Sequence, residues 1–173
     1  MQKIAARFQN RNRAFTFRKP VRRRVVVLLL AALPAAGGLA QSPPRPEALI
    51  KWRQSAFQVI AWNTGRIRSA LTGEYDSGEV RRAANAVSAV ANSGLGDLFA
   101  PGTAGGKGWR ESAANAAVFD DAAKFRALSE QFAHETAELA RVASAGDQQA
   151  VTRQFAKVAQ TCKTCHDKFR QTG

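Results

Sequence analysis

The chain has 173 residues, of which 26 are Lys or Arg and 13 are Asp or Glu, for a formal charge of +13. That length suits one domain, and a hydrophobic share of 45% excludes a wholly disordered chain. A charge of +13 would normally indicate nucleic acid or an anionic membrane as partner. However, residues 1–40 hold nine Lys/Arg and no acid, whereas residues 41–173 hold 17 Lys/Arg and 13 Asp/Glu, a formal +4. We therefore predict no nucleic-acid partner.

The first forty residues have the layout of a secretory signal peptide. A basic stretch precedes the apolar run VVVLLLAAL, and small residues follow up to Ala40. The run is too short for a membrane span, which needs about 20 apolar residues. We expect cleavage after Ala40, with Ala36 as the second choice, and export of residues 41–173 to the periplasm without membrane insertion. The alternative is a basic tail that is retained and binds an anionic surface.

Four segments of the exported part have apolar residues at three- and four-residue steps, which is typical of amphipathic helices. These segments cover about residues 46–71, 77–94, 112–145 (with a broken first turn) and 148–171. Ser77 and Asp147 are expected N-caps, and a glycine follows the first and the third helix. No stretch has the alternation of a strand. The pattern predicts an all-α, antiparallel up-down-up-down four-helix bundle.

One long loop interrupts this pattern at residues 94–110, which contain six glycines and a proline. That composition does not support regular structure. Loops of this length inside a compact domain are usually functional.

The segment Cys162-Lys163-Thr164-Cys165-His166 has the C-x-x-C-H spacing of a c-type haem attachment site. On a helix, positions i, i+3 and i+4 share one face, so Cys162, Cys165 and His166 point to the same side. Two thiols there can add across the two vinyl groups of one porphyrin, and the imidazole can bind the iron. The motif predicts one covalent haem c.

Three alternatives explain the cysteine pair less well. A thioredoxin-like redox pair belongs near a strand–helix unit, and none is visible. A zinc site needs two further ligands, but the only other histidine is His134 and no further cysteine exists. A plain disulfide inside the helix leaves His166 unexplained.

The sixth position of the iron is predicted to be open. Electron-transfer haems commonly use Met or a second His there. The only methionine is Met1, which leaves with the signal peptide. His134 lies about 200° round its helix from the buried stripe, so we interpret it as a surface residue. A lysine, a tyrosine or a terminal amine stays an alternative ligand.

Three segments make the chain resemble the cytochrome c′ family of class II c-type cytochromes. They are IKWRQSAFQVIAWNTGRI, LFAPGTAGG and CKTCHDKFR, and the resemblance covers nearly all of residues 47–173. It implies a four-helix bundle in which Cys162 and Cys165 hold the haem by thioethers and His166 is the axial ligand. It also implies that Arg170 lies on the proximal side of the haem.

Four more residues are assigned to the haem neighbourhood by the same resemblance. Arg53 and Gln54 would approach the propionates and ring edge, and Phe57 would cover the distal face. Trp109 lies near the position where the family places a tryptophan. Independently, Arg53 falls on the core stripe, and a buried arginine needs an anionic partner such as a propionate. The alternatives are solvated side chains and an ordinary core phenylalanine.

An open iron face covered by an apolar residue is suited to small neutral diatomic gases such as NO and CO. The resemblance implies NO binding and electron transfer. We therefore expect a gas-binding haem protein and not an enzyme. The alternative is an electron carrier between periplasmic redox proteins. A weak peroxidase ranks below both, because no acid–base residue is expected near Phe57.

The first helix also carries a second apolar stripe formed by Trp52, Val59 and Trp62. Two indoles off the core stripe indicate a helix–helix contact between two copies of the chain. The resemblance likewise favours a homodimer. The alternative is a wide core face.

Overall fold

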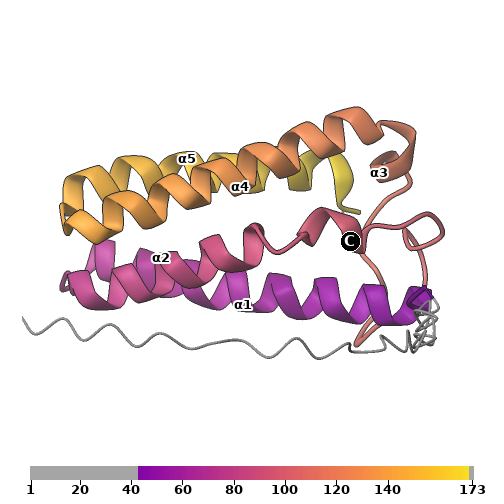
Figure 1. Cartoon of the computed structure of the whole chain (residues 1–173), viewed down its shortest axis with the longest axis horizontal. Helices are drawn as coiled ribbons and strands as arrows, with labels where there is room; N and C mark the ends of the chain where they lie inside the picture. Colours follow the sequence, from indigo (N-terminus) through magenta and orange to yellow (C-terminus); the bar gives the residue numbers. More distant parts are fainter. Residues whose placement is uncertain (1–42, 172–173) are drawn as a thin grey trace, which may run out of the picture. The chain divides into compact units, whose positions relative to one another are not determined.

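The computed structural model describes residues 43–171, so the predicted signal peptide lies outside the described residues. The elements in chain order are α1 (Pro46–Thr72), α2 (Ser77–Ala91), the 3-10 helix η1 (Leu95–Leu98), α3 (Ala117–Asp120), α4 (Ala122–Ala145) and α5 (Gln148–Phe169). Helices α1, α2, α4 and α5 are long, and within residues 43–171 the only β pairing consists of isolated bridges. The predicted all-α architecture is confirmed (Figure 1).

The helix ends follow local capping chemistry. Helix α1 has Pro46 in its first turn, where a missing N–H costs nothing, and ends before Gly73. The N-cap of α2 is Asp76 and not the expected Ser77, because the Asp76 carboxylate accepts hydrogen bonds from two main-chain N–H groups at 2.8 and 3.0 Å. Asp147 caps α5 as predicted. Gly146 ends α4 at φ 77°, a conformation that favours glycine.

The predicted third helix starts later than its sequence suggests. Residues 112–116 are not helical, and α3 is a single turn before α4 begins at Ala122. The cause is a long-range pairing, because Ala114 forms an antiparallel bridge with Arg170. In addition, the Asn115 main-chain N–H donates to the Phe169 carbonyl at 3.0 Å. These bonds take main-chain groups that a helix would have used.

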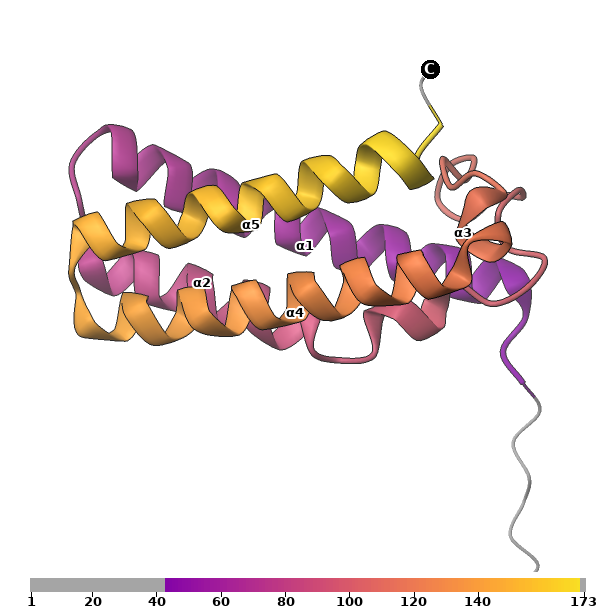
Figure 2. The ribbon, with the colours of Figure 1, turned by 90° about the horizontal axis from the view of Figure 1, so that it is seen from above.

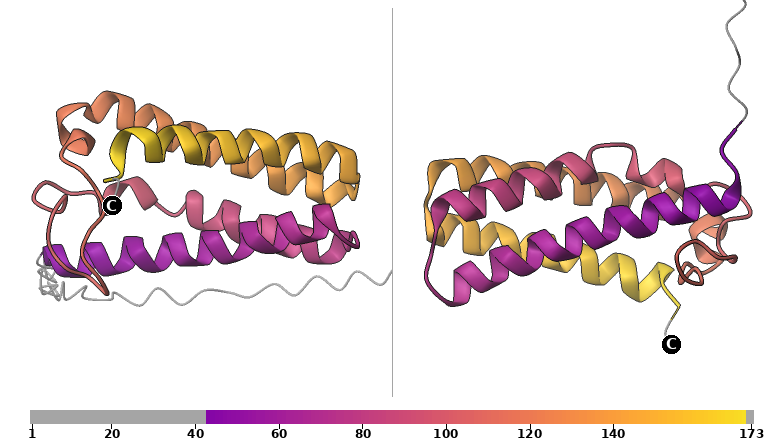
Figure 3. Two further views of the ribbon diagram at one scale, coloured as in Figure 1. Left: turned by 180° about the vertical axis from the view of Figure 1, so that it is seen from behind. Right: turned by 90° about the horizontal axis from the view of Figure 1, so that it is seen from below.

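The bundle packs in sequence, with α1 on α2, α2 on α4 and α4 on α5. Figures 2 and 3 show α4 and α5 as one layer and α1 and α2 as the other. Within residues 43–171, α1 and α5 pack less closely than these pairs. Ile67 of α1 and Val151 of α5 share one core cluster, and other residues of both helices line a shared cavity.

The two ends of the bundle differ. At the turn end, defined by the short links at residues 73–76 and 146–147, aliphatic side chains fill the core. They include the fully buried Ile67, Val80, Leu139 and Val151. At the loop end, residues 99–116 and α3 cover the bundle (Figure 1). No helix within residues 43–171 is long and apolar enough to cross a membrane.

Candidate haem site

A cavity of about 510 Å³ opens between α1 and α5 at the loop end. Its walls also include η1, α4 and the segment that follows the glycine-rich loop. Phenylalanines contributed by α1, α4, α5 and the residue after η1 make much of the lining apolar. An apolar cavity with a few polar groups is the usual form of a cofactor site.

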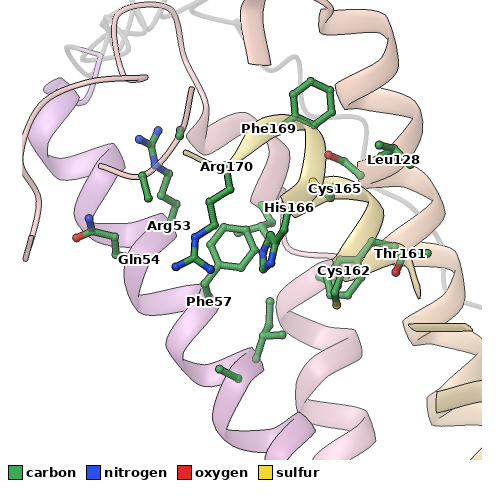
Figure 4. A pocket seen from close by; sticks show the side chains of 18 of the residues that line it. Arg53, Gln54, Phe57, Leu128, Thr161, Cys162, Cys165, His166, Phe169 and Arg170 are labelled. Carbon is green, nitrogen blue, oxygen red and sulfur yellow. The ribbon is translucent and has the colours of Figure 1, made fainter. Parts of the chain in front are cut away.

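The α5 wall carries the three residues of the C-x-x-C-H motif together. Cys162, Cys165 and His166 all line the cavity (Figure 4). Both cysteines are free and half-buried. Burial raises the pKa of each thiol, and the neighbouring Cys162 raises that of Cys165 further, so both groups stay protonated at neutral pH. Two neutral thiols one turn apart are therefore presented to the same space.

His166 reaches the cavity between the cysteines and the chain that follows α5. Desolvation lowers the pKa of its imidazole, and the positive charge of Arg170 lowers it further. A neutral imidazole has the free nitrogen lone pair that a metal ligand requires. Arg170 lines the cavity as well, so the structure brings these two predicted site residues together.

Phe57 occupies the α1 wall. Figure 4 shows its ring and the imidazole of His166 projecting into the same space from different helices. Phe57 is 37% exposed, which is high for a phenylalanine, and it lines the cavity. The assigned axial and distal residues thus belong to separate walls of one cavity.

Arg53 is buried, with 4% of its surface exposed, and the sequence expectation of a buried arginine is confirmed. Its guanidinium donates to the Thr103 hydroxyl at 2.8 Å, to the Thr103 carbonyl, to the Ser112 hydroxyl at 2.6 Å and to the Leu98 carbonyl at 3.4 Å. Burial lowers the pKa of Arg53. The hydrogen bonds of Arg53 hold the residues from Leu98 to Ser112 against α1. Contact between Arg53 and a haem propionate stays a prediction.

Gln54 fastens the same loop one residue further along α1. Its side-chain oxygen accepts from the Trp109 main-chain N–H at 2.8 Å, and its nitrogen donates to the Arg110 carbonyl at 2.9 Å. The main chain at Gly108 lies close to α1 because Gly108 has no side chain. A Cβ there would lie 2.6 Å from the Gln54 side-chain oxygen and 2.9 Å from the Lys51 main-chain nitrogen. Both Arg53 and Gln54 also line the cavity.

Trp109 is the one predicted cofactor residue that the structure does not bring to the cavity wall. Its indole N–H donates to the Ser55 hydroxyl at 2.9 Å, and the Lys51 ammonium lies 5.2 Å from the ring centroid. The side chain is 65% exposed. Because Gly108 and Gln54 hold its main chain against α1, its ring covers the outside of that helix.

Among residues 43–171, the lining holds none of the alternative side-chain ligands considered from sequence, although it includes one carboxylate, Glu111. It contains no second histidine and no methionine, lysine or tyrosine. The His134 side chain is 79% exposed and lies 3.8 Å from Glu135, as its predicted surface position requires. Within that range, no group of three or more His, Cys, Asp or Glu side chains has an arrangement that could hold a metal ion.

Several residues of the site were missed by sequence reasoning. Phe99 and Phe125 line the cavity, and Thr103 and Ser112 anchor Arg53. Phe99 and Thr103 lie in the segment LFAPGTAGG, so that segment was the available signal. Phe125 falls within the predicted third helix, and the spacing of that segment gave it no role in the site.

The donor set fits a covalently attached haem. Two free thiols and a neutral imidazole lie on one helical face beside an apolar cavity, which is the arrangement that thioether attachment and axial ligation need. The fold and this wall together define a c-type haem protein built on a four-helix bundle.

Comparison with known proteins gives the family. Residues 48–170 match the family Cytochrome C′. The cytochrome c′ of Rhodocyclus tenuis is 48% identical over 130 residues, 75% of this chain and 98% of that protein. The cytochrome c′ of Allochromatium vinosum is 35% identical over 146 residues, 84% and 92% of the two chains. The chain belongs to the cytochrome c′ family, whose members carry covalently attached haem c with iron.

Solved structures give the same result. A cytochrome c′ described by an unusual ligand-controlled dimer dissociation has a TM-score of 0.73 and 34% identity, and the match covers 76% of this chain and 100% of that chain. The nitric oxide complex of a leucine-to-alanine mutant of cytochrome c prime from Alcaligenes xylosoxidans has a TM-score of 0.67 and 28% identity over the same shares. The predicted four-helix bundle is confirmed.

Proposed function

We propose that the protein is a periplasmic haem protein whose iron has one protein ligand, His166, and that it binds small gases such as NO and CO on the side covered by Phe57. The haem supplies the iron coordination position that a gas can occupy. The chain supplies the thiols that hold the haem, the imidazole on one side and an apolar ring on the other.

One observation carries this proposal. Among residues 43–171, the cavity lining offers a single histidine and no methionine, lysine or tyrosine. Phe57 brings only a hydrocarbon surface to the other wall. An apolar cover disfavours water and charged ligands but admits a neutral diatomic molecule. The solved nitric oxide complex of a relative is consistent with this reading.

Coordination is tested first. The absorption spectra of the purified holoprotein in both oxidation states, and the electron paramagnetic resonance spectrum of its ferric form, should be those of a five-coordinate haem. The His134→Ala variant is a matched control and should give the same spectra, because that side chain is 79% exposed. A low-spin, six-coordinate spectrum would contradict the open site.

Gas binding is tested next by titrating the ferrous protein with NO and, separately, with CO. Each gas should shift the Soret band with a saturable dependence on concentration. The Phe57→Ala variant should bind CO faster, because truncation removes the ring that a gas must pass. Absence of a spectral change with either gas would end the gas-binding proposal.

The second candidate is an electron carrier, and one observation favours it. Arg68, Arg110 and Arg170 line the cavity and are exposed. Glu111 is the one exposed acid in that described lining, so the opening carries net positive charge toward solvent. An acidic redox partner would be attracted to such a rim. Electron exchange with an acidic donor protein should then slow as salt rises. A rate that does not change with salt would contradict this docking mode.

Export is proposed for residues 1–40, which lie outside the described residues. The mass of the protein recovered from a periplasmic extract should correspond to a chain that begins at Gln41 and carries one covalently attached haem. Recovery of the full chain from the cytoplasm would support the alternative of a retained basic tail.

A homodimer is proposed on the exposed stripe of α1. Trp52, Val59 and Trp62 are 52%, 42% and 65% exposed, as the second stripe predicted. The Arg66 guanidinium lies 4.7 Å from the Trp62 ring and 3.1 Å from Glu79 of α2, so this aromatic surface is held in place. The described dimer dissociation of a related cytochrome c′ supports a paired state.

Light scattering of the mature holoprotein tests the homodimer. The wild type should have twice the mass of one chain, and Trp62→Glu should shift it to a monomer. Lys157→Glu, a charge reversal on the exposed part of α5, is the control and should stay dimeric. A monomeric wild type would contradict the proposed pairing.

A further inference from the structure

Four phenyl rings form a continuous row along the cavity wall. The Phe57 ring of α1 lies 6.3 Å from the Phe99 ring, with an interplanar angle of 68°. Phe99 lies 4.8 Å from Phe125 of α4, and Phe125 lies 5.3 Å from Phe169 at the end of α5. Edge-to-face and tilted contacts at these centroid distances are attractive. The row therefore links the α1 wall to the α5 wall.

Phe99 is held more firmly than Phe57. On one side the Arg53 guanidinium carbon lies 4.7 Å from the Phe99 centroid, and on another Phe125 packs against the ring. Arg53 is itself fixed by its buried hydrogen bonds to Thr103. Phe57, in contrast, is 37% exposed. The firmly held ring of Phe99 therefore limits the motion of the more exposed ring of Phe57.

We propose that Phe99 is a positioning residue that holds the ring of Phe57 over the distal side of the haem and so slows the entry of gases. This inference rests on the proposed gas-binding function. A gas that approaches the iron opposite His166 must displace the Phe57 ring. The ring cannot tilt toward Phe99 without moving a side chain that Arg53 and Phe125 hold. Phe99 acts through Phe57.

The kinetic test compares CO binding in ferrous holoprotein variants. Phe99→Leu should speed CO association by up to about tenfold, the range that one aromatic contact covers, with a smaller change in dissociation. Phe119→Leu is the matched control: it makes the same substitution on α3, at a phenylalanine that lies outside the cavity lining and packs against the core cluster of Val118, Leu128 and Phe169, and it should leave the association rate unchanged. An unchanged rate in Phe99→Leu would overturn the inference.

A double-mutant cycle shows whether Phe99 acts through Phe57. In a Phe57→Ala background, Phe99→Leu should have no further effect on CO association, since the ring it positions is gone. The same acceleration in both backgrounds would overturn the positioning role. A wild type that binds neither CO nor NO would instead refute the proposed function, so the two failures are distinguishable.

Ring motion gives a readout that does not depend on gas kinetics. In the diamagnetic ferrous, CO-bound holoprotein labelled with ¹³C-phenylalanine, nuclear magnetic resonance measures the flip rate of the Phe57 ring. That rate should rise in Phe99→Leu and stay unchanged in Phe119→Leu. A merely structural role for Phe99 would lower the melting temperature without changing the Phe57 flip rate, and that result would also overturn the inference.

Discussion

The turn end and the loop end of the bundle are built from the same four helices but are packed in opposite ways. At the turn end, aliphatic side chains such as Leu139 and Val151 are fully buried, and Asp76 and Asp147 cap the helices. At the loop end, aromatic rings surround a cavity of about 510 Å³, and a buried arginine fastens the loop. A cavity lacks the packing contacts that stabilise a filled core. The close-packed turn end therefore supplies stability that the loop end, with its cavity, does not.

The largest expected effect is at the loop end. Replacing both Cys162 and Cys165 by Ala should abolish covalent haem, because these thiols are the candidate attachment points. Haem should then be removed by acidic acetone and be absent from denaturing gels stained for haem. Thr164→Ala is the control within the motif, where the hydroxyl donates to the Gln160 carbonyl at 2.9 Å and accepts from the Gln160 side-chain nitrogen at 3.3 Å. Retained covalent haem in the double variant would place attachment elsewhere.

Truncation of the dense core should separate stability from gas binding. Leu139→Ala removes a side chain with no exposed surface, so the free energy of unfolding should fall by about 2–5 kcal/mol. Chemical denaturation measures this loss, and CO association should stay at the wild-type rate. Arg126→Ala, an exposed change on the same helix, should alter stability by less than about 0.5 kcal/mol. A large change in CO rate would show that the two ends are coupled.

A smaller loss is expected when the loop anchor is changed. Arg53→Lys keeps the charge but cannot reach Thr103 and Ser112 together, which leaves buried oxygens without donors. The free energy of unfolding should fall by about 1–3 kcal/mol, and limited proteolysis should cut the loop at residues 100–112 faster. Arg126→Lys, on an exposed face of α4, should leave both measurements unchanged. Equal protease resistance would show that Arg53 does not hold the loop.

The smallest effect concerns the cap of α2 at the turn end. Hydrogen bonds from the main-chain N–H groups of Glu79 and Gly78 lower the pKa of Asp76. A lowered folded-state pKa means that this carboxylate stabilises the fold above its unfolded pKa and loses that effect as pH falls through the folded pKa. Asp76→Ala should therefore melt a few degrees lower at pH 7.

The pH dependence of that difference is the decisive part. The gap in melting temperature between wild type and Asp76→Ala should close as pH falls below about 4. Asp76→Asn should keep most of the cap, since asparagine is an equally good N-cap. A gap that stays constant with pH would mean that the charge of Asp76 contributes nothing.

The features predicted from sequence are those encoded over short distances. Helical spacing located the long helices, and the i, i+3, i+4 pattern placed Cys162, Cys165 and His166 on one face of α5, where the structure has them. The exposed stripe of α1 followed from the same periodicity. Each of these inferences needs only the geometry of a single helix.

The features that were missed depend on contacts between distant segments. The alanine-rich stretch before α3 favours helix by composition, but Ala114 pairs with Arg170 across 56 positions of sequence. Phe99 and Thr103 acquire their roles only when the glycine-rich loop folds back on α1. Trp109 was assigned to the haem by neighbourhood alone, and sequence does not tell on which side of α1 its ring lies.

The close approach of Gly108 to α1 bears on how variants of this protein would be interpreted. At that position any side chain would meet the main chain of Lys51 and the buried side chain of Gln54. In a screen of all single substitutions, we expect Gly108 to tolerate as little change as the two cysteines. A geneticist who saw only the screen would place this loop glycine in the cofactor site, although its role is to let two backbones touch.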